Sequence, residues 1–128
     1  MFLGGLDDRI RCAVAVGFMT TWRDFLLDKC FTHTWMTYVP LLPRELDFPE
    51  ILALRAPAAT RVQNCNEDAL YTLGEMKRAD EIMRETFERA KAGDKYQCNF
   101  YPGGHKLDKP MQADAFAWFD RHLGGGRG

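Results

Sequence analysis

The fold of this chain is decided by Phe100-Tyr101-Pro102-Gly103-Gly104-His105-Lys106. The residues just before this stretch, 95–101, alternate between apolar and polar, which predicts an edge strand with one better-solvated face. Pro102-Gly103-Gly104 then ends the strand sharply. Glycines let such a turn present a neighbouring ring without steric conflict. We therefore predict a strand that leads into a turn carrying the imidazole of His105.

A second strand end, Asn64-Cys65-Asn66-Glu67-Asp68, carries carboxylates instead. The strand predicted before it, 60–65, is weaker in composition because several of its residues are polar. A parallel sheet delivers functional groups at the carboxyl ends of its strands. An acid, either Glu67 or Asp68, is therefore expected near His105, as in two members of a Ser-His-Asp triad. The chain contains no serine to complete one.

The other elements follow in a regular order. Residues 11–19 form a continuous apolar run, which predicts a strand covered on both faces. An apolar stripe over residues 73–92 predicts an amphipathic helix that Gly93 ends, and a last helix is predicted over 110–123. Residues 1–9 are typical of the end of a short helix. The order predicts an α/β fold, a small three-stranded parallel sheet flanked by helices.

A long aromatic segment joins the first two strands. It predicts a short helix from Trp22 to Cys30, a further piece around Trp35 and a helix from Phe48 to Leu54 with Pro49 in its first turn. Excursions after the carboxyl end of a strand often line a substrate pocket. The aromatic side chains here either do so or pack a satellite core, and we favour the core.

Length and composition limit the class of protein. A chain of 128 residues with 46% hydrophobic and 27% charged residues is typical of one globular domain. We place that domain at residues 1–123 and expect a disordered glycine-rich tail at 124–128. The formal net charge of −1 is no reason to expect nucleic acid or an anionic membrane as a partner.

The same features bear on location and cofactors. The first residues lack the pattern of a signal peptide, and no apolar run is long enough to cross a membrane. The four cysteines form no CxxC pair that would suggest zinc or a disulfide framework. We therefore expect a cytoplasmic protein with no metal and no cofactor.

Taken together, these motifs resemble the carboxyl-terminal half of an α/β-hydrolase. The resemblance rests on a strand ending in Asn-Glu-Asp-Ala-Leu-Tyr (66–71), an amphipathic helix, a strand ending in Phe-Tyr-Pro-Gly-Gly-His-Lys (100–106) and a closing helix with Ala-Phe-Ala-Trp-Phe-Asp-Arg-His-Leu (115–123). It is closest to the dienelactone hydrolase and acetyl xylan esterase branch. In that family the order along the chain is nucleophile, acid, histidine. The resemblance implies that Asp68 is the acid and His105 the general base.

The resemblance also implies what is missing. The G-x-S-x-G elbow and the oxyanion-hole loop of the family have no counterpart here, so the chain resembles a truncated α/β-hydrolase fold. Cys65 is the candidate for a nucleophile within the chain, although a cysteine at this place is also typical of a small buried hydrophobe. Thr20 and Thr21 would need an elbow that is absent. Water or a nucleophile from another chain are the remaining alternatives.

Two functions stay open at this point. One is an esterase-like hydrolase acting on small carboxylic esters with an Asp-His pair. The other is a catalytically inactive truncated domain that serves as an assembly or ligand-binding module. In either case the first strand would have a bare apolar edge, so we expect a homo-oligomer, formed across that edge or through the aromatic segment 22–48.

Overall fold

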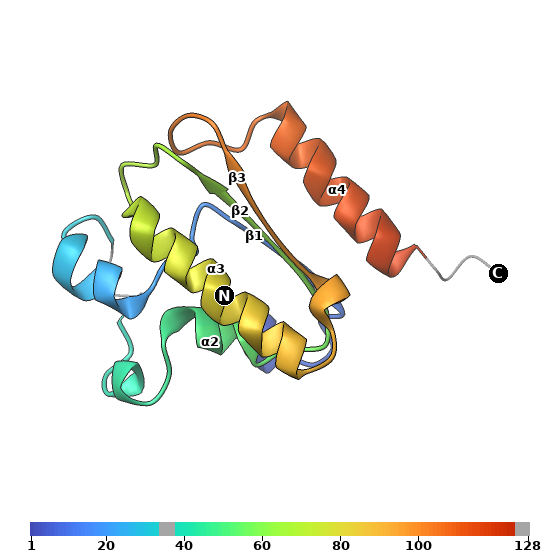
Figure 1. The fold of residues 1–128 in the computed structure, drawn as a ribbon, viewed down its shortest axis with the longest axis horizontal. Helices are drawn as coiled ribbons and strands as arrows, with labels where there is room; N and C mark the ends of the chain where they lie inside the picture. The colour runs from blue at the N-terminus through green and yellow to red at the C-terminus, as the bar shows by residue number, and fades with distance from the viewer. Residues whose placement is uncertain (34–37, 125–128) are drawn as a thin grey trace.

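The computed structural model describes residues 1–33 and 38–124. It contains a three-stranded parallel sheet in the order β1-β2-β3, with β1 (Cys12–Val16), β2 (Ala59–Cys65) and β3 (Tyr96–Tyr101). Helices α1 (Phe2–Leu6), α2 (Phe48–Ala53) and α3 (Leu73–Arg89) lie on one side of the sheet, and α4 (Lys109–Leu123) lies on the other (Figure 1). The predicted α/β fold with a small parallel sheet flanked by helices is therefore confirmed.

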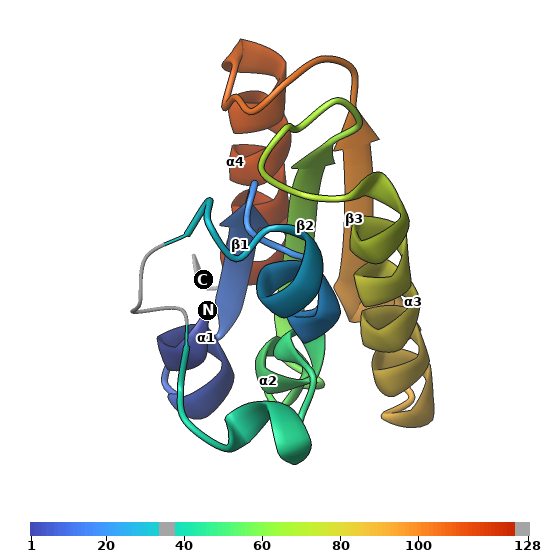
Figure 2. The same ribbon diagram turned by 90° about the vertical axis from the view of Figure 1, so that its left-hand side faces the viewer.

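The two outer strands differ from the central one in burial. β2 is buried along its whole length, with β1 and β3 beside it and helices over both faces (Figure 2). Residues 13–16 of β1 are half-buried. Val14 packs on the α4 side and Ala15 on the α3 side, so the strand has cover on both faces, as predicted. Among the described residues, β1 has a neighbour on one side only.

The hydrogen bonding of β1 shows which of its backbone groups point away from β2, toward the side where the described residues form no neighbouring strand. The amide of Gly17, just after the strand, donates to the carbonyl of Gln63 over 2.8 Å. Because backbone groups alternate in direction along a strand, those of Val14 and Val16 face away from β2. They form the exposed edge that the sequence led us to expect.

The core has three parts. α3 turns its apolar face, Met76, Ala79, Met83 and Phe87, toward the sheet. The aromatic segment forms a second cluster with α2 and the start of α3, comprising Trp22, Phe25, Phe48, Ile51, Tyr71 and Met76. These aromatic residues thus pack a satellite core, as favoured from the sequence, while Trp35 lies outside the described residues. Under α4, Trp118 packs against Cys12 and Ala59.

Local sequence signals set the remaining boundaries. The predicted helix from Trp22 is observed as a short π-helical segment, η1 (Asp24–Asp28). Short 3-10 turns, η3 (Leu42–Arg44) and η4 (Gly93–Lys95), precede α2 and β3. α2 begins with a capping box between Asp47 and Glu50. Asp108 caps α4, where its side chain accepts from the amide of Met111. Of the predicted tail, residues 125–128 lie outside the described residues.

Candidate functional site

The structure brings Asp68 and His105 together at the carboxyl end of the sheet. Asp68 follows β2 and His105 follows β3, and the two strands are parallel neighbours. The Nδ1 atom of His105 lies 2.7 Å from Oδ2 of Asp68. The alternative acid, Glu67, is exposed, and its amide donates to the carbonyl of Gly103 instead.

The protons of this pair can be assigned from its contacts. Oδ1 of Asp68 accepts from the amide of Leu70 over 3.0 Å, which leaves Oδ2 for the imidazole. A carboxylate only accepts hydrogen bonds, so Nδ1 of His105 carries the proton in this contact. In the neutral ring the lone pair is then on Nε2, the nitrogen that a general base uses.

Exposure separates the two members of the pair. The Asp68 side chain is 1% exposed, whereas that of His105 is 51% exposed. The acid is therefore shielded and held, and the ring can reach a molecule in solution. This division between a buried orienting carboxylate and an accessible imidazole is what general base chemistry requires.

Gly17 is a part of the site that the sequence did not point to. It follows β1 with φ +56°, and a Cβ atom placed on it would lie 2.8 Å from Cε1 of His105. Only glycine combines this left-handed conformation with so close an approach to the ring. A single glycine at the end of an apolar strand was the one available signal.

The loops that carry the acid and the histidine are joined by their backbones. The amide of Asn66 donates to the carbonyl of Tyr101 over 2.9 Å, and that of Glu67 donates to Gly103 over 3.1 Å. These bonds continue the β2–β3 pairing beyond the strands. They keep the two strand ends side by side where Asp68 and His105 meet.

Cys65 does not lie in the environment of a reactive thiol. Cys65 lies at the end of β2 and is 1% exposed. Burial raises the pKa of the thiol, and the backbone N–H of Lys106 offsets this only in part. Reactive cysteines are accessible and have a lowered pKa, so this geometry favours the interpretation of Cys65 as a small buried hydrophobe.

The threonines after β1 are committed to structure. The hydroxyl of Thr20 donates to Oδ2 of Asp24 over 2.7 Å, and that of Thr21 donates to Oε2 of Glu75 over 2.6 Å. Both threonines are fully buried. Oδ2 of Asp24 also accepts from the amide of Thr72, so this cluster joins η1 to the start of α3. Neither hydroxyl is placed to attack a substrate.

His33 belongs to the aromatic wall beside the site. The hydroxyl of Thr32 donates to the carbonyl of Lys29, so it must accept from Nδ1 of His33, 2.7 Å away. Nε2 of His33 then accepts from the hydroxyl of Tyr71 over 3.0 Å. Burial lowers the pKa of His33 and favours its neutral form. Its ring packs edge-on against that of Phe25, so His33 is a packed polar residue.

Other features lie away from this pair. A concavity of about 620 Å³ at the amino end of the sheet, between residues 5–11 and 54–58, is not lined by Asp68 or His105. No three His, Cys, Asp or Glu residues within 1–33 and 38–124 are grouped to hold a metal ion. Over the same residues, no helix combines the length and the apolar character needed to cross a membrane.

The fold is similar to that of solved esterases. A carbohydrate esterase family 15 glucuronoyl esterase from Caldicellulosiruptor kristjansonii matches with a TM-score of 0.72 and 16% identity, over 95% of this chain and 39% of that one. A promiscuous esterase of family 15 from a marine bacterial metagenome matches with a TM-score of 0.66 and 16% identity, over 94% and 38%. A methylesterase matches with a TM-score of 0.52 and 14% identity, over 59% and 17%.

These matches define the class of fold. No protein-family model matches the sequence, and a search of curated proteins found no match. The chain spans less than half the length of each of these esterases. Together with the topology, they show that this chain has part of an α/β-hydrolase fold, which confirms the resemblance inferred from the sequence at the level of the fold.

Proposed function

We propose that this chain provides the acid and base of an esterase-like hydrolase that acts on small carboxylic esters. The observation that carries the proposal is the 2.7 Å contact between buried Asp68 and accessible His105. The fold shared with esterases supports it. Asp68 orients the ring, and Nε2 of His105 takes the proton from the attacking group.

The attacking group is water or a hydroxyl from another chain. The chain has no serine, and Cys65 is buried with a raised thiol pKa. With water, Nε2 takes one proton while the oxygen bonds to the ester carbonyl carbon. The tetrahedral intermediate then releases the alcohol, which takes the proton from Nε2–H, and the acid product leaves.

Hydrolysis of a short-chain aryl ester by the purified protein tests this role. His105→Ala is expected to abolish the hydrolysis above the rate in buffer, because it removes the base. The matched control is His122→Ala, since His122 packs on the Trp118 ring near the end of α4. An unchanged rate in His105→Ala would exclude the role of His105.

The second candidate is an inactive truncated domain that serves as an assembly or ligand-binding module. The absence of serine and the buried state of Thr20, Thr21 and Cys65 favour it. It predicts that the wild-type protein hydrolyses esters no faster than His105→Ala. Labelling by an activated phosphonate at one defined residue, with loss of activity, would count against it.

We also propose that the chain self-associates. The half-buried β1 presents the backbone of Val14 and Val16 to solvent at an open sheet edge. The segment 22–48 offers the alternative surface, with exposed Leu27, Phe31 and Leu41. Size-exclusion chromatography with light scattering is expected to show a dimer or larger species. A monomer at micromolar concentration would exclude this proposal.

A further inference from the structure

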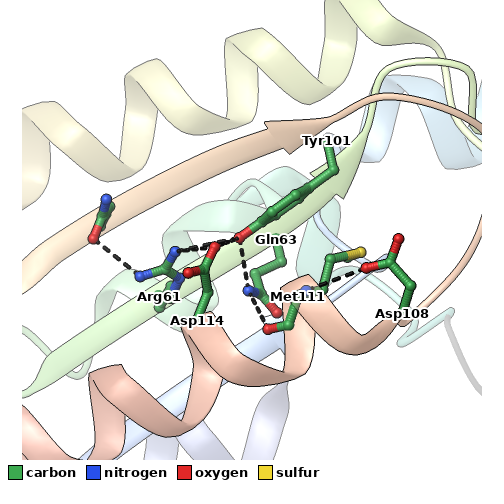
Figure 3. A network of polar contacts seen from close by, with 7 residues as sticks. Arg61, Gln63, Tyr101, Asp108, Met111 and Asp114 are labelled. Atoms are coloured by element: carbon green, nitrogen blue, oxygen red, sulfur yellow. Dashed lines mark hydrogen bonds and ion pairs between the residues drawn. The ribbon is translucent and has the colours of Figure 1, made fainter.

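A buried polar network lies between the sheet and α4 (Figure 3). Arg61 and Gln63 point from the middle of β2 toward this helix, and they are 7% and 0% exposed. Polar groups inside a covered sheet cost free energy unless they are hydrogen-bonded. These polar residues weakened the prediction of β2 from the sequence. Their hydrogen-bond partners explain how they are accommodated inside the fold.

Tyr101, the last residue of β3, is the centre of the network. Its hydroxyl donates to Oδ2 of Asp114 in α4 over 2.6 Å. It accepts from Nε2 of Gln63 over 2.9 Å and from a guanidinium nitrogen of Arg61 over 3.3 Å. The residue at which the His105 loop begins is thus bonded to both β2 and α4.

The segment that follows the His105 loop is also bonded to β2. Nε2 of Gln63 also donates to the carbonyl of Met111 in the first turn of α4, over 2.9 Å. Arg61 forms an ion pair with Asp114 over 3.3 Å, and its own side chain is only 8% exposed. The loop of residues 102–108, which includes His105, is therefore bonded to β2 on both sides: through Tyr101 before it and through Met111 after it.

The same strand carries the acid. Asp68 lies three residues after Cys65, the last residue of β2. The distance between the acid and the base thus depends on how firmly the His105 loop is attached to β2. His105 itself is half-exposed, so few side-chain contacts hold its ring.

We propose that Tyr101, Arg61, Gln63 and Asp114 are positioning residues that hold His105 against Asp68. This inference rests on the proposed role of His105 as the base. The network sets the position of the loop, and through it the Nδ1–Oδ2 contact. None of the four residues needs to touch the substrate.

β3 offers a matched control at its other end. The hydroxyl of Tyr96 donates to Oδ1 of Asp80 over 2.8 Å, and Arg84 lies 3.1 Å from Asp80. These groups use the same chemistry on the α3 side of the sheet, at the amino end of β3. They have no bond to the His105 loop.

The experiment compares Tyr101→Phe and Asp114→Ala with Tyr96→Phe and Asp80→Ala. The readout is the ¹⁵N chemical shifts of the two ring nitrogens of His105, with the ring neutral and its signals assigned from His105→Gln. These shifts report which nitrogen carries the proton, and the Oδ2 acceptor of Asp68 beside Nδ1 favours the Nδ1–H form. A merely structural contribution lowers the unfolding midpoint without moving them.

In wild type, we expect the Nδ1–H tautomer to dominate. In Tyr101→Phe and Asp114→Ala, we expect at least half of that population to be lost to the Nε2–H form. Any hydrolysis should fall about tenfold or more, which corresponds to roughly 1.4 kcal/mol. Tyr96→Phe and Asp80→Ala should keep the wild-type tautomer.

Two results would overturn the proposal. One is a wild-type tautomer in both folded test variants, and the other is an equal loss in the Tyr96 and Asp80 controls. If Tyr101→Phe does not fold, Asp114→Ala decides, because the Asp114 side chain is 49% exposed and its loss is better tolerated. The tautomer is measured without an ester, so absence of hydrolysis would remove the proposed function without deciding this test.

Discussion

The two ends of the sheet each bury a charged side chain, and they use it differently. At the amino end, the guanidinium of Arg55 donates to the carbonyls of Gly4, Ile10 and Ala59 over 2.8, 3.0 and 3.4 Å. At the carboxyl end, Asp68 accepts one backbone amide and gives its second oxygen to the half-exposed ring of His105. The side chain of Arg55 is hydrogen-bonded to backbone carbonyls alone. That of Asp68 is hydrogen-bonded to an imidazole that is open to solvent.

Under the proposed function, the difference separates a structural charge from a functional one. The bonds of Arg55 join α1, the segment before β1 and the start of β2, so its loss should affect the whole fold. Asp68 holds a ring that can act on another molecule, so its loss should affect chemistry more than stability. Four predictions test this contrast, in order of their expected effect on the free energy of unfolding.

The largest effect is expected for Arg55→Met. Three carbonyl groups, of which that of Ala59 belongs to a buried residue, lose a charged donor. Each such bond is worth on the order of 1 kcal/mol, so we expect a loss of about 3 kcal/mol. Urea denaturation measures it, with Arg44→Met on the exposed η3 turn as the control. Equal midpoints for the two variants would contradict a structural role for Arg55.

Gly17→Ala should cost less stability but disturb the site. An alanine in the left-handed conformation costs roughly 1 to 2 kcal/mol, and its Cβ would lie 2.8 Å from Cε1 of His105. We expect the ring to move away from Asp68 and its tautomer to change, as detected by NMR spectroscopy.

Gly74→Ala is the matched control for that substitution. Gly74 lies in α3, where a Cβ would meet no atom within 4 Å. Alanine should therefore stabilise the helix by about 1 kcal/mol and leave His105 unchanged. A wild-type tautomer in Gly17→Ala would show that the close approach to the ring has no effect on the site.

Asp68→Asn should change stability by no more than about 1 kcal/mol, because the amide oxygen can still accept from Leu70. Its NH₂ group would donate to Nδ1 of His105 and favour the Nε2–H tautomer, which has no lone pair on Nε2 to act as the base. Any hydrolysis is expected to fall on the order of 10³-fold or more. Steady-state rates measure this, and an activity close to wild type would contradict the proposed pair.

The last prediction concerns how the stability of the fold depends on pH. Burial lowers the pKa of His33 from its usual value of 6.5, so the unfolded chain binds its proton more readily than the folded one. The stability from neutral His33 is therefore present above about pH 6.5 and is lost as the pH falls through the folded pKa. His33→Gln should make unfolding midpoints fall less steeply below that pH, and an unchanged slope would contradict it.

The sequence alone determined the class of fold and the order of its elements. Apolar runs, helical periodicity and the breaks at Gly93 and Pro102 are local signals, and they predicted three parallel strands and the helices between them. They also predicted that His105 and an acid would meet at neighbouring strand ends. Boundaries shifted by a few residues, because strand and helix ends depend on their neighbours.

Only the tertiary structure decided which groups meet. It placed Asp68, the acid that the resemblance implied, against His105, and it showed that Cys65 is buried and that Gly17 lies against the ring. It also showed that Arg61 and Gln63 of β2 have partners on β3 and α4. Such contacts join residues far apart in the chain, so neither composition nor periodicity can reveal them.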